Sequence, residues 1–216
     1  MSMGEEEREG FAAFILRMRA LGVSSKELLS GFEAIPRSAF IAPEWKNFAW
    51  SNRSVPIECG ETLEPCDLDG IVIDALGLAP NVRVLEVGTG TGYTAAVMSR
   101  LAERVLSFDR YKTLIENASQ RHDALGLSNI SLRQADGSEG PGEGPFDRIV
   151  VWAAFEEAPR RFVEFLTSGG VLVAPVGPGD GVQTMARFVK VGSRFERTDL
   201  VPVRLQPLAK GIAQAL

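Results

Sequence analysis

The sequence predicts a doubly wound, mostly parallel α/β sheet, closed by antiparallel C-terminal strands and preceded by an N-terminal helical segment. An apolar, β-branched run at residues 82–87 has the pattern of a strand that is buried on both faces. A glycine-rich loop follows this strand and leads into a helical stretch at residues 94–104. Strand and helix patterns then alternate as far as residue 176, which is the order of a doubly wound sheet.

The first 80 residues predict helices and a long irregular connection. Apolar residues recur at helical spacing over residues 11–21, and Ser24 or Ser25 could cap a second helix that ends at residue 35. Residues 40–52 are rich in aromatic side chains and predict an irregular segment that packs on the main domain. A further helix is expected at residues 70–78, with Asp67 or Asp69 as its cap.

The rest of the chain predicts the sheet itself. We expect residues 1–80 to pack on a cofactor-binding domain formed by residues 81–216, the two making one compact unit. After the strand at 82–87, the predicted elements are strands at 105–109, 130–135, 147–153 and 171–176, helices at 111–125 and 159–166, and a closing antiparallel pair at 183–191 and 198–205.

Composition excludes several classes of function. The chain has 216 residues, 45% of them hydrophobic and 24% charged, with a net charge of −5 that argues against non-specific nucleic-acid binding. No apolar run reaches membrane-spanning length, and the acidic start lacks the features of a signal peptide, so a cytoplasmic location is expected. Cys59, Cys66 and the single His122 make no metal site, and the two thiols are expected to be buried or half-buried.

The loop after the first predicted strand has the composition of a cofactor site. Gly88, Gly90 and Gly92 alternate with threonines, beginning with Thr89, and let a ligand approach main-chain N–H groups. Glu86 places a carboxylate at the end of the strand, which disfavours a pyrophosphate and favours a cationic ligand. Because the glycine spacing also departs from G-x-G-x-x-G, the sequence favours a sulfonium cofactor over a dinucleotide.

Two more acidic residues end neighbouring strands. Asp109 follows the second predicted strand, where a carboxylate can accept hydrogen bonds from both ribose hydroxyls of a nucleoside. Asp136 follows the third and could accept from an adenine amino group. Since ligands of such sheets bind beyond the carboxyl ends of the strands, the three acids predict one site.

These motifs resemble those of class I S-adenosylmethionine-dependent methyltransferases, which have a Rossmann-like fold. The resemblance rests on E-V-G-T-G-T-G-Y, S-F-D and A-D-G. Further segments narrow it to the protein-L-isoaspartate O-methyltransferases, and it covers nearly the whole chain. These segments are A-I-P-R-S-A-F-I-A-P-E, V-P-I-E-C-G-E-T-L, G-P-F-D-R-I-V-V-W-A-A, L-T-S-G-G-V-L-V-A-P-V-G and V-P-V-R-L-Q-P-L.

The resemblance implies a cofactor, a substrate and a set of contacts. S-adenosyl-L-methionine would be the cofactor, and the acceptor would be the carboxylate of an isoaspartyl residue in a damaged protein, whose methyl ester cyclises and can reopen as aspartate. Glu86 and the glycine loop would lie against the methionine moiety. Asp109 would hold the ribose, and Asp136 with Gly137 the adenine.

The chain departs from the family in the loop that faces the substrate. Residues 60–66 are G-E-T-L-E-P-C where the family has roughly G-Q-T-I-S-x-P, so Thr62 is kept and Glu64 occupies the family's serine position. Thr62 and Glu64 are the candidate catalytic residues. A second carboxylate about 4 Å from an acceptor carboxylate would repel it by roughly 4 kcal/mol at an effective dielectric of about 20.

Three interpretations of Glu64 stay open on the sequence. The side chain could point away and leave an ordinary isoaspartyl methyltransferase. It could act as the general base for a different, neutral acceptor. It could pair with the sulfonium in a protein that binds the cofactor without catalysis.

Overall fold

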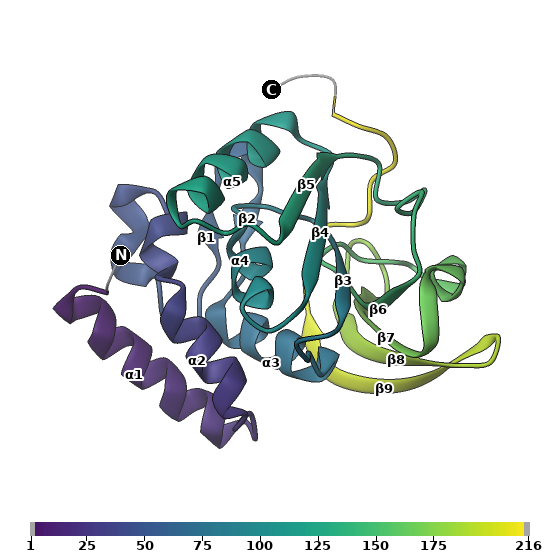
Figure 1. The fold of residues 1–216 in the computed structure, drawn as a ribbon, viewed down its shortest axis with the longest axis horizontal. Helices are drawn as coiled ribbons and strands as arrows, with labels where there is room; N and C mark the ends of the chain where they lie inside the picture. Colours follow the sequence, from purple (N-terminus) through teal and green to yellow (C-terminus); the bar gives the residue numbers. More distant parts are fainter. Residues whose placement is uncertain (1–2, 214–216) are drawn as a thin grey trace.

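Seven strands form one sheet, in the order β5-β4-β3-β6-β7-β8-β9 (Figure 1). The computed structural model describes residues 3–213. Neighbouring strands from β5 to β7 are parallel, and β8 and β9 are antiparallel, which confirms the predicted fold class. The strands are β3 (Arg83–Val87), β4 (Arg104–Asp109), β5 (Ile130–Gln134), β6 (Phe146–Val151), β7 (Leu166–Val176), β8 (Gln183–Val191) and β9 (Arg194–Val203).

Five α-helices and four short 3₁₀ helices accompany the sheet in the described part of the chain. The α-helices are α1 (Glu5–Ala20), α2 (Lys26–Ala34), α3 (Cys66–Leu76), α4 (Tyr93–Ser99) and α5 (Lys112–Ala124). The 3₁₀ helices are η1 (Arg37–Phe40), η2 (Pro43–Phe48), η3 (Glu58–Gly60) and η4 (Arg160–Phe165). None of the helices in residues 3–213 has both the length and the apolar character needed to cross a membrane.

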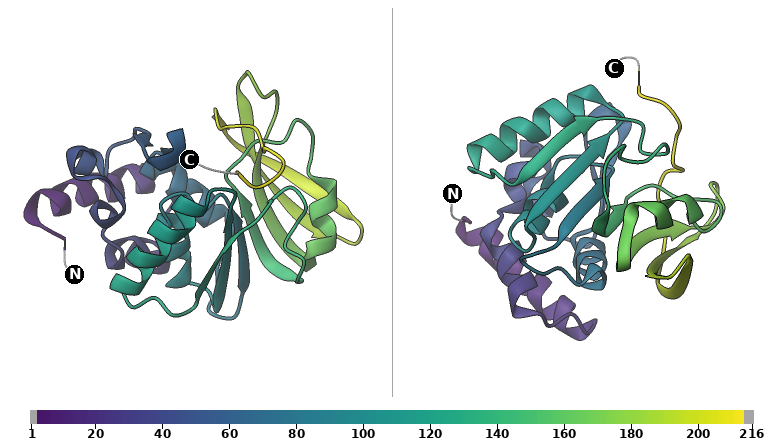
Figure 2. Two further views of the ribbon diagram at one scale, coloured as in Figure 1. Left: turned by 90° about the horizontal axis from the view of Figure 1, so that it is seen from above. Right: turned by 45° about the vertical axis from the view of Figure 1, so that its right-hand side comes forward.

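The two faces of the sheet belong to two separate hydrophobic clusters. Val84 and Val105 point into a cluster that also contains side chains of α1 to α4. Leu85 and Leu106, one position further along the same strands, point into the opposite cluster. Figure 2 (left) shows the N-terminal helices gathered on one side of the sheet. This alternation explains why the strands are apolar at nearly every position.

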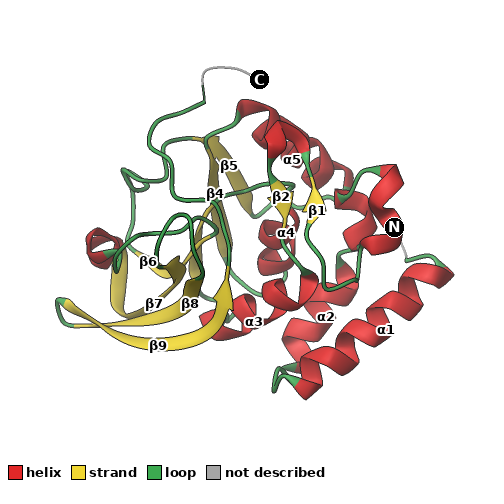
Figure 3. Cartoon of the chain, turned by 180° about the vertical axis from the view of Figure 1, so that it is seen from behind, coloured by secondary structure: helices red, strands yellow, loops and turns green. Residues whose placement is uncertain are grey.

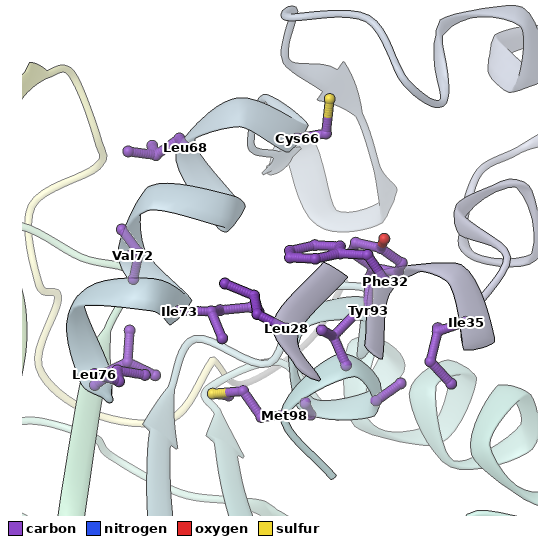
Figure 4. Packing of buried hydrophobic residues seen from close by; sticks show 14 of the residues in the cluster. Leu28, Phe32, Ile35, Cys66, Leu68, Val72, Ile73, Leu76, Tyr93 and Met98 are labelled. Atoms are coloured by element: carbon purple, nitrogen blue, oxygen red, sulfur yellow. The ribbon is translucent and has the colours of Figure 1, made fainter. Parts of the chain in front are cut away.

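Helices α2, α3 and α4 pack together on the first face. Phe32 of α2, Ile73 of α3 and Met98 of α4 are at most 1% exposed and belong to one cluster of buried side chains (Figure 4). Tyr93, at the start of α4, is also fully buried and packs against Phe40 with their rings 5.4 Å apart. The N-terminal segment and the sheet therefore share one core. The division of the chain into segments 1–80 and 81–216 stays a prediction.

The second face carries less helix than the sequence predicted. The helix expected at residues 159–166 is the 3₁₀ helix η4, so the prediction of a helix there is right in place and wrong in type. Phe162 of η4 is 2% exposed and packs edge-on against Phe155 and Phe165. The short helix η4 therefore covers part of this face through its aromatic side chains.

Helix α3 begins four residues earlier than predicted, at Cys66 rather than at residue 70. Its N-cap position is Pro65, and no side chain caps it, so the prediction that Asp67 or Asp69 caps the helix is wrong. Both carboxylates lie inside the first turn and are bound by arginines from the N-terminal segment, Asp67 by Arg17 and Asp69 by Arg37. Long-range ion pairing decides the position of these two residues.

Helix α4 ends at Ser99, five residues before the predicted end. The side-chain amide of Asn129 donates to the carbonyl groups of Ser99, Ala102 and Glu103, at 2.9, 3.3 and 3.2 Å. These hydrogen bonds stabilise a turn after the helix, so that the next strand can start at Arg104.

The other element ends agree with the sequence to within a few residues, with two exceptions. Helix α1 starts at Glu5 instead of residue 11, and β7 starts at Leu166 instead of residue 171. Ser25 caps α2 as predicted, its hydroxyl accepting from Leu28 N–H at 3.2 Å. Cys59 is half-buried and Cys66 buried, which confirms the expectation for the thiols.

A small two-stranded sheet precedes α3 and carries part of the loop at residues 60–66. Strands β1 (Val55–Pro56) and β2 (Thr62–Leu63) pair antiparallel. Figure 3 shows this pair on the helical side of the main sheet, beside α5. Glu58, between the two strands, accepts from Asn117 and Arg121 of α5 at 3.0 and 3.4 Å, which fixes the loop against the domain.

Candidate active site

The loop between β3 and α4 is anchored to the end of the neighbouring strand. The N–H groups of Gly88 and Thr89 both donate to the carbonyl of Phe108, at 2.8 and 3.0 Å. Gly88, Gly90 and Gly92 have φ angles of +97°, +51° and +84°, which a glycine adopts without strain. The sequence therefore forms a tight loop at the carboxyl edge of the sheet, where the fold class predicts a ligand.

The three glycines of this loop have different structural roles. A Cβ on Gly90 would meet only Ile57 Cδ1, at 3.6 Å, so its main chain is accessible from the cavity described below. A Cβ on Gly92 would lie 2.7 Å from His122 Nε2 and 2.8 Å from Ala118 Cβ, both on α5. Gly88 and Gly90 line the cavity, whereas Gly92 does not and allows α4 and α5 to pack closely.

A cavity of about 680 Å³ opens at the carboxyl ends of β3 and β4. Its walls come from the glycine loop, the β2–α3 connection and residues 204–209, which are far apart in the sequence. Charged side chains on the walls are mostly acidic. They are Glu61, Glu64, Asp69, Asp109 and Asp180, against Arg110 and Arg204.

Glu86 is fully buried and is not among the residues that line the cavity. Its Oε1 accepts from Thr94 Oγ1 at 2.5 Å and from Trp152 Nε1 at 3.0 Å, and its Oε2 accepts from Ser107 Oγ at 2.6 Å. Burial raises the pKa of Glu86 to about 7, and the three hydrogen bonds act in the opposite direction. Glu86 therefore holds together the groups behind the cavity wall, of which Thr94 and Trp152 reach the wall itself.

Asp109 lies on the cavity wall with both carboxylate oxygens oriented by main-chain donors. Gly90 N–H donates to Oδ2 at 2.9 Å, and Tyr111 N–H donates to Oδ1 at 3.0 Å. The side chain is 8% exposed, and its pKa is raised because burial outweighs these hydrogen bonds. Each oxygen keeps a further lone pair, so the carboxylate can accept two hydroxyl groups side by side.

Asp136 is turned away from the cavity, while its neighbours Ala135 and Gly137 line it. Its oxygens accept from Ser138 N–H at 2.8 Å and Gly211 N–H at 2.6 Å. Burial acts to raise its pKa, but these hydrogen bonds outweigh it, so the pKa lies below its usual value. A Cβ on Gly137 would overlap Val87 Cγ1, which shows how closely this turn packs on β3.

Thr62 and Glu64 form the opposite wall. Thr62 Oγ1 donates to Glu64 Oε1 at 3.1 Å, and both side chains line the cavity, so Glu64 does not point away from it. Burial raises the pKa of Glu64 to about 7, and the nearby Asp69 carboxylate adds to the shift. The structure thus brings Thr62, Glu64, Gly88, Thr89, Gly90, Asp109 and Gly137 to one cavity and leaves Glu86, Gly92 and Asp136 behind its walls.

Several residues around the cavity were not predicted from the sequence. Ser107 was visible as the one polar residue between apolar neighbours in V-L-S-F, a signal that a buried strand needs a hydrogen-bond partner there. Arg37 is 1% exposed and pairs with Asp69, yet nothing in A-I-P-R-S predicts that an arginine is buried. Both were missed because their partners lie more than 20 residues away in the chain.

A family model agrees with the geometry. Residues 11–213 match the model described as protein-L-isoaspartate(D-aspartate) O-methyltransferase. A protein-L-isoaspartate O-methyltransferase of Rhizobium meliloti is 45% identical over 202 residues, covering 93% of this chain and 99% of the relative. One of Azorhizobium caulinodans is 42% identical over 217 residues, covering the whole of both chains.

Solved structures agree as well. A protein-L-isoaspartate O-methyltransferase superposes with a TM-score of 0.81 at 25% identity, covering 95% of this chain and 67% of its own. A Plasmodium falciparum protein, solved in complex with S-adenosyl-L-homocysteine, superposes with a TM-score of 0.77 over 92% of this chain and 98% of its own. At 20% identity the second similarity supports the fold.

Proposed function

The chain belongs to the protein-L-isoaspartate(D-aspartate) O-methyltransferase family, and from this premise we propose that it methylates the carboxyl group of L-isoaspartyl residues in damaged proteins. The observation that carries the proposal is the match of nearly the whole chain to this one family. S-adenosyl-L-methionine supplies the methyl group when it is bound. The resulting ester can cyclise and reopen as aspartate, so the activity is one of protein repair.

The residues of the glycine-loop wall fit this cofactor. We propose that Gly88, Thr89 and Gly90 present their main chain to the methionine moiety, because no Cβ of a glycine obstructs the approach. Asp109 would accept the two ribose hydroxyls with the lone pairs that Gly90 and Tyr111 leave free. A carboxylate that main-chain donors already orient loses little freedom when the ligand binds.

The remaining predicted cofactor residues would act through their neighbours. Glu86 would orient Thr94 and Trp152, and Asp136 would hold the turn at Gly137 against the adenine. Gly92 would set the position of the loop by packing on α5. Each of the three is a positioning residue in this proposal.

The acceptor needs alignment more than activation. An isoaspartyl carboxylate is already an anionic nucleophile, so no general base is required and the wall formed by Thr62 and Glu64 need only orient it. Five carboxylates on the walls and a net charge of −5 would repel a polyanion, which supports the proposal that the acceptor is a protein and not a nucleic acid. We also propose that the enzyme acts in the cytoplasm.

Methyl ester formation tests the proposal. The purified protein is incubated with labelled S-adenosyl-L-methionine and either an isoaspartyl peptide or the same peptide with normal aspartate. Base-labile label is expected on the isoaspartyl peptide alone. If calorimetry shows clear binding of S-adenosyl-L-homocysteine but the isoaspartyl peptide gains no label, the proposed activity is refuted, while the assignment of the cofactor stands.

One observation favours a second candidate function. Glu64 lies on the cavity wall with a pKa of about 7, which is the range of a general base for a neutral hydroxyl or amine acceptor. Glu64→Ser would then abolish transfer to that acceptor. If this variant keeps the full rate, Glu64 is not a general base.

A further inference from the structure

The wall opposite the glycine loop contains a group of charged residues that the cofactor does not need. Arg37 of η1, Glu64 after β2 and Asp69 of α3 meet at one end of the cavity, and we call them the acceptor-wall cluster. Arg37 and Asp69 are each 1% exposed. Three ionisable groups therefore share a site with little access to solvent.

Arg37 carries the single positive charge of the cluster and forms an ion pair with Asp69. Arg37 Nη1 binds Asp69 Oδ2, while Nη2 donates to the main-chain carbonyl of Glu64 and not to its carboxyl group. The guanidinium also lies over the ring of Tyr93, 4.6 Å from its centroid, which holds it in this orientation. Arg37 and Asp69 thus neutralise each other, and the Glu64 carboxyl group has no cation of its own.

Glu64 has one side-chain partner in the described part of the chain. Thr62 Oγ1 donates to Oε1, which leaves Oε2 as the oxygen that can carry a proton. The other titratable or charged groups that face this region are Asp69 and Cys66 on α3, Arg37 on η1, Glu61 before β2, Tyr93 on α4 and Glu86 on β3. Burial and the charges of Asp69 and Glu61 favour the neutral form of Glu64 and outweigh the opposite effects of Thr62 and Arg37, so its pKa rises to about 7.

An acceptor carboxylate brings a further negative charge to this wall. Two carboxylates in one poorly solvated site do not both stay ionised, and one proton between them removes the repulsion. Asp69 already has Arg37 as its counter-ion, so the proton belongs on Glu64.

We propose, resting on the isoaspartyl activity proposed above, that Glu64 determines the acceptor by donating a hydrogen bond from its own carboxyl proton to the acceptor carboxylate. The protonated side chain does what a serine hydroxyl could do at this position, and it does so only while it is neutral. The step itself balances without it: an acceptor oxygen forms the new C–O bond, the S–CH₃ bond breaks with its electron pair going to sulfur, and the proton stays on Glu64.

The ionisation of Glu64 should affect binding of the acceptor and not the rate of methyl transfer. Above pH 7, the KM for the isoaspartyl peptide should rise about tenfold per pH unit, because only the neutral form of Glu64 binds the acceptor. The kcat should change by less than about threefold, since a saturating acceptor selects the protonated enzyme. Release of S-adenosyl-L-homocysteine is the readout, because it does not depend on the lability of the ester.

Two substitutions at Glu64 test whether the acceptor needs a hydrogen-bond donor at this position or only the absence of a negative charge. Glu64→Gln keeps a donor and cannot ionise, so its KM should stay near the wild-type value at pH 6 and remain flat to pH 8.5. Glu64→Ala has neither donor nor charge, so its KM should be flat and about tenfold higher than that of Glu64→Gln. Thermal unfolding of both variants at pH 6 shows that the fold is kept.

Glu61→Gln is the matched control, since it removes a carboxylate from the same wall near Asp109 and Tyr111. It should keep the wild-type rise of KM with pH. A wild-type KM that is constant from pH 6 to 8.5, a rise that persists in Glu64→Gln, or equal KM values for Glu64→Gln and Glu64→Ala would each overturn the inference. Absence of methyl transfer to the peptide at every pH would instead refute the proposed function.

Discussion

The two sides of the cavity each contain a buried glutamate, and the two glutamates differ in their partners. Glu86 and Glu64 both have a pKa of about 7, with burial as the largest cause. Three side-chain donors bind Glu86, whereas only Thr62 binds the Glu64 carboxyl group in the described part of the chain. A raised pKa alone therefore does not separate a structural carboxyl group from one available to a ligand.

Hydrogen-bond satisfaction makes the distinction. Glu86 is enclosed by donors from β4, from α4 and from the residue after β6, so its acceptor capacity is used within the fold. Glu64 faces the cavity with one oxygen unassigned, and the neighbouring Asp69 Oδ1 is buried without a partner. A polar group left unsatisfied beside a cavity is available to a ligand or an ordered water.

The largest expected effect is on stability, from Glu86→Ala. Removing the carboxylate leaves the donors of Thr94 and Trp152 buried without this acceptor and leaves Ser107 with Thr89 alone as its hydroxyl partner, and we expect a loss of about 4 kcal/mol in the free energy of unfolding. Glu64→Ala, measured by the same urea titration at pH 7, should cost less than about 1 kcal/mol, because the exposed hydroxyl of Thr62 is the only side-chain partner of Glu64 within residues 3–213. Equal losses from the two variants would contradict the comparison.

Two glycine substitutions should separate stability from binding. Gly92→Ala puts a Cβ within 2.8 Å of two atoms of α5 at a φ of +84°, so we expect a loss of about 3 kcal/mol in thermal or urea unfolding. Gly90→Ala meets nothing closer than 3.6 Å and should cost only about 1 kcal/mol of backbone strain. Its main effect should be weaker binding of S-adenosyl-L-homocysteine, since the Cβ enters the cavity.

Stability should fall as the pH rises from 6 to 8. The pKa values of Glu64 and Glu86 are about 7 in the folded protein and near 4.5 when unfolded, so the folded state binds more protons in this range. Their contribution is therefore greatest at acidic pH and is lost through pH 7, by about 2 to 3 kcal/mol for the pair. Urea unfolding at pH 6, 7 and 8 measures it. Glu64→Gln should remove about half of the slope, and an unchanged slope would contradict the assignment.

The smallest effect is expected from Asp109→Asn, which keeps the shape of the side chain. It replaces one carboxylate oxygen by an amide donor, so a ribose hydroxyl loses its acceptor and S-adenosyl-L-homocysteine should bind about tenfold more weakly. Calorimetry measures the change. Asp123→Asn, at an exposed position of α5, is the control and should bind as the wild type does.

Local pattern predicted most of the fold, and seven of the ten candidate site residues chosen from the sequence line the cavity. The strands β3 and β4, helix α5 and the cap at Ser25 follow from apolar periodicity and capping chemistry, which act within a few residues. Asp109 and the glycine loop were also predictable, because a strand end followed by glycine places them at the ligand edge of any such sheet.

The failures share a cause in contacts between distant segments. Asp67 and Asp69 have the composition of helix caps, yet Arg17 and Arg37 draw them into the first turn of α3 and so start the helix early. Helix α4 is shortened by Asn129, which lies 30 residues beyond Ser99. No spacing rule within one segment contains such pairs.

The sequence by itself determined the class of sheet, the edge where a ligand binds and the chemistry of a methyl-donating cofactor, because these depend on short-range pattern and on motifs that stay together in the chain. Only the tertiary structure decided which carboxylates face the cavity. Glu86 is held behind the wall by donors from three other segments, while Glu64 is left facing the cavity, because the neighbouring cation Arg37 is bound to Asp69. Arg37 lies 32 positions from Asp69 and 27 from Glu64 in the chain, so only folding brings the three residues together.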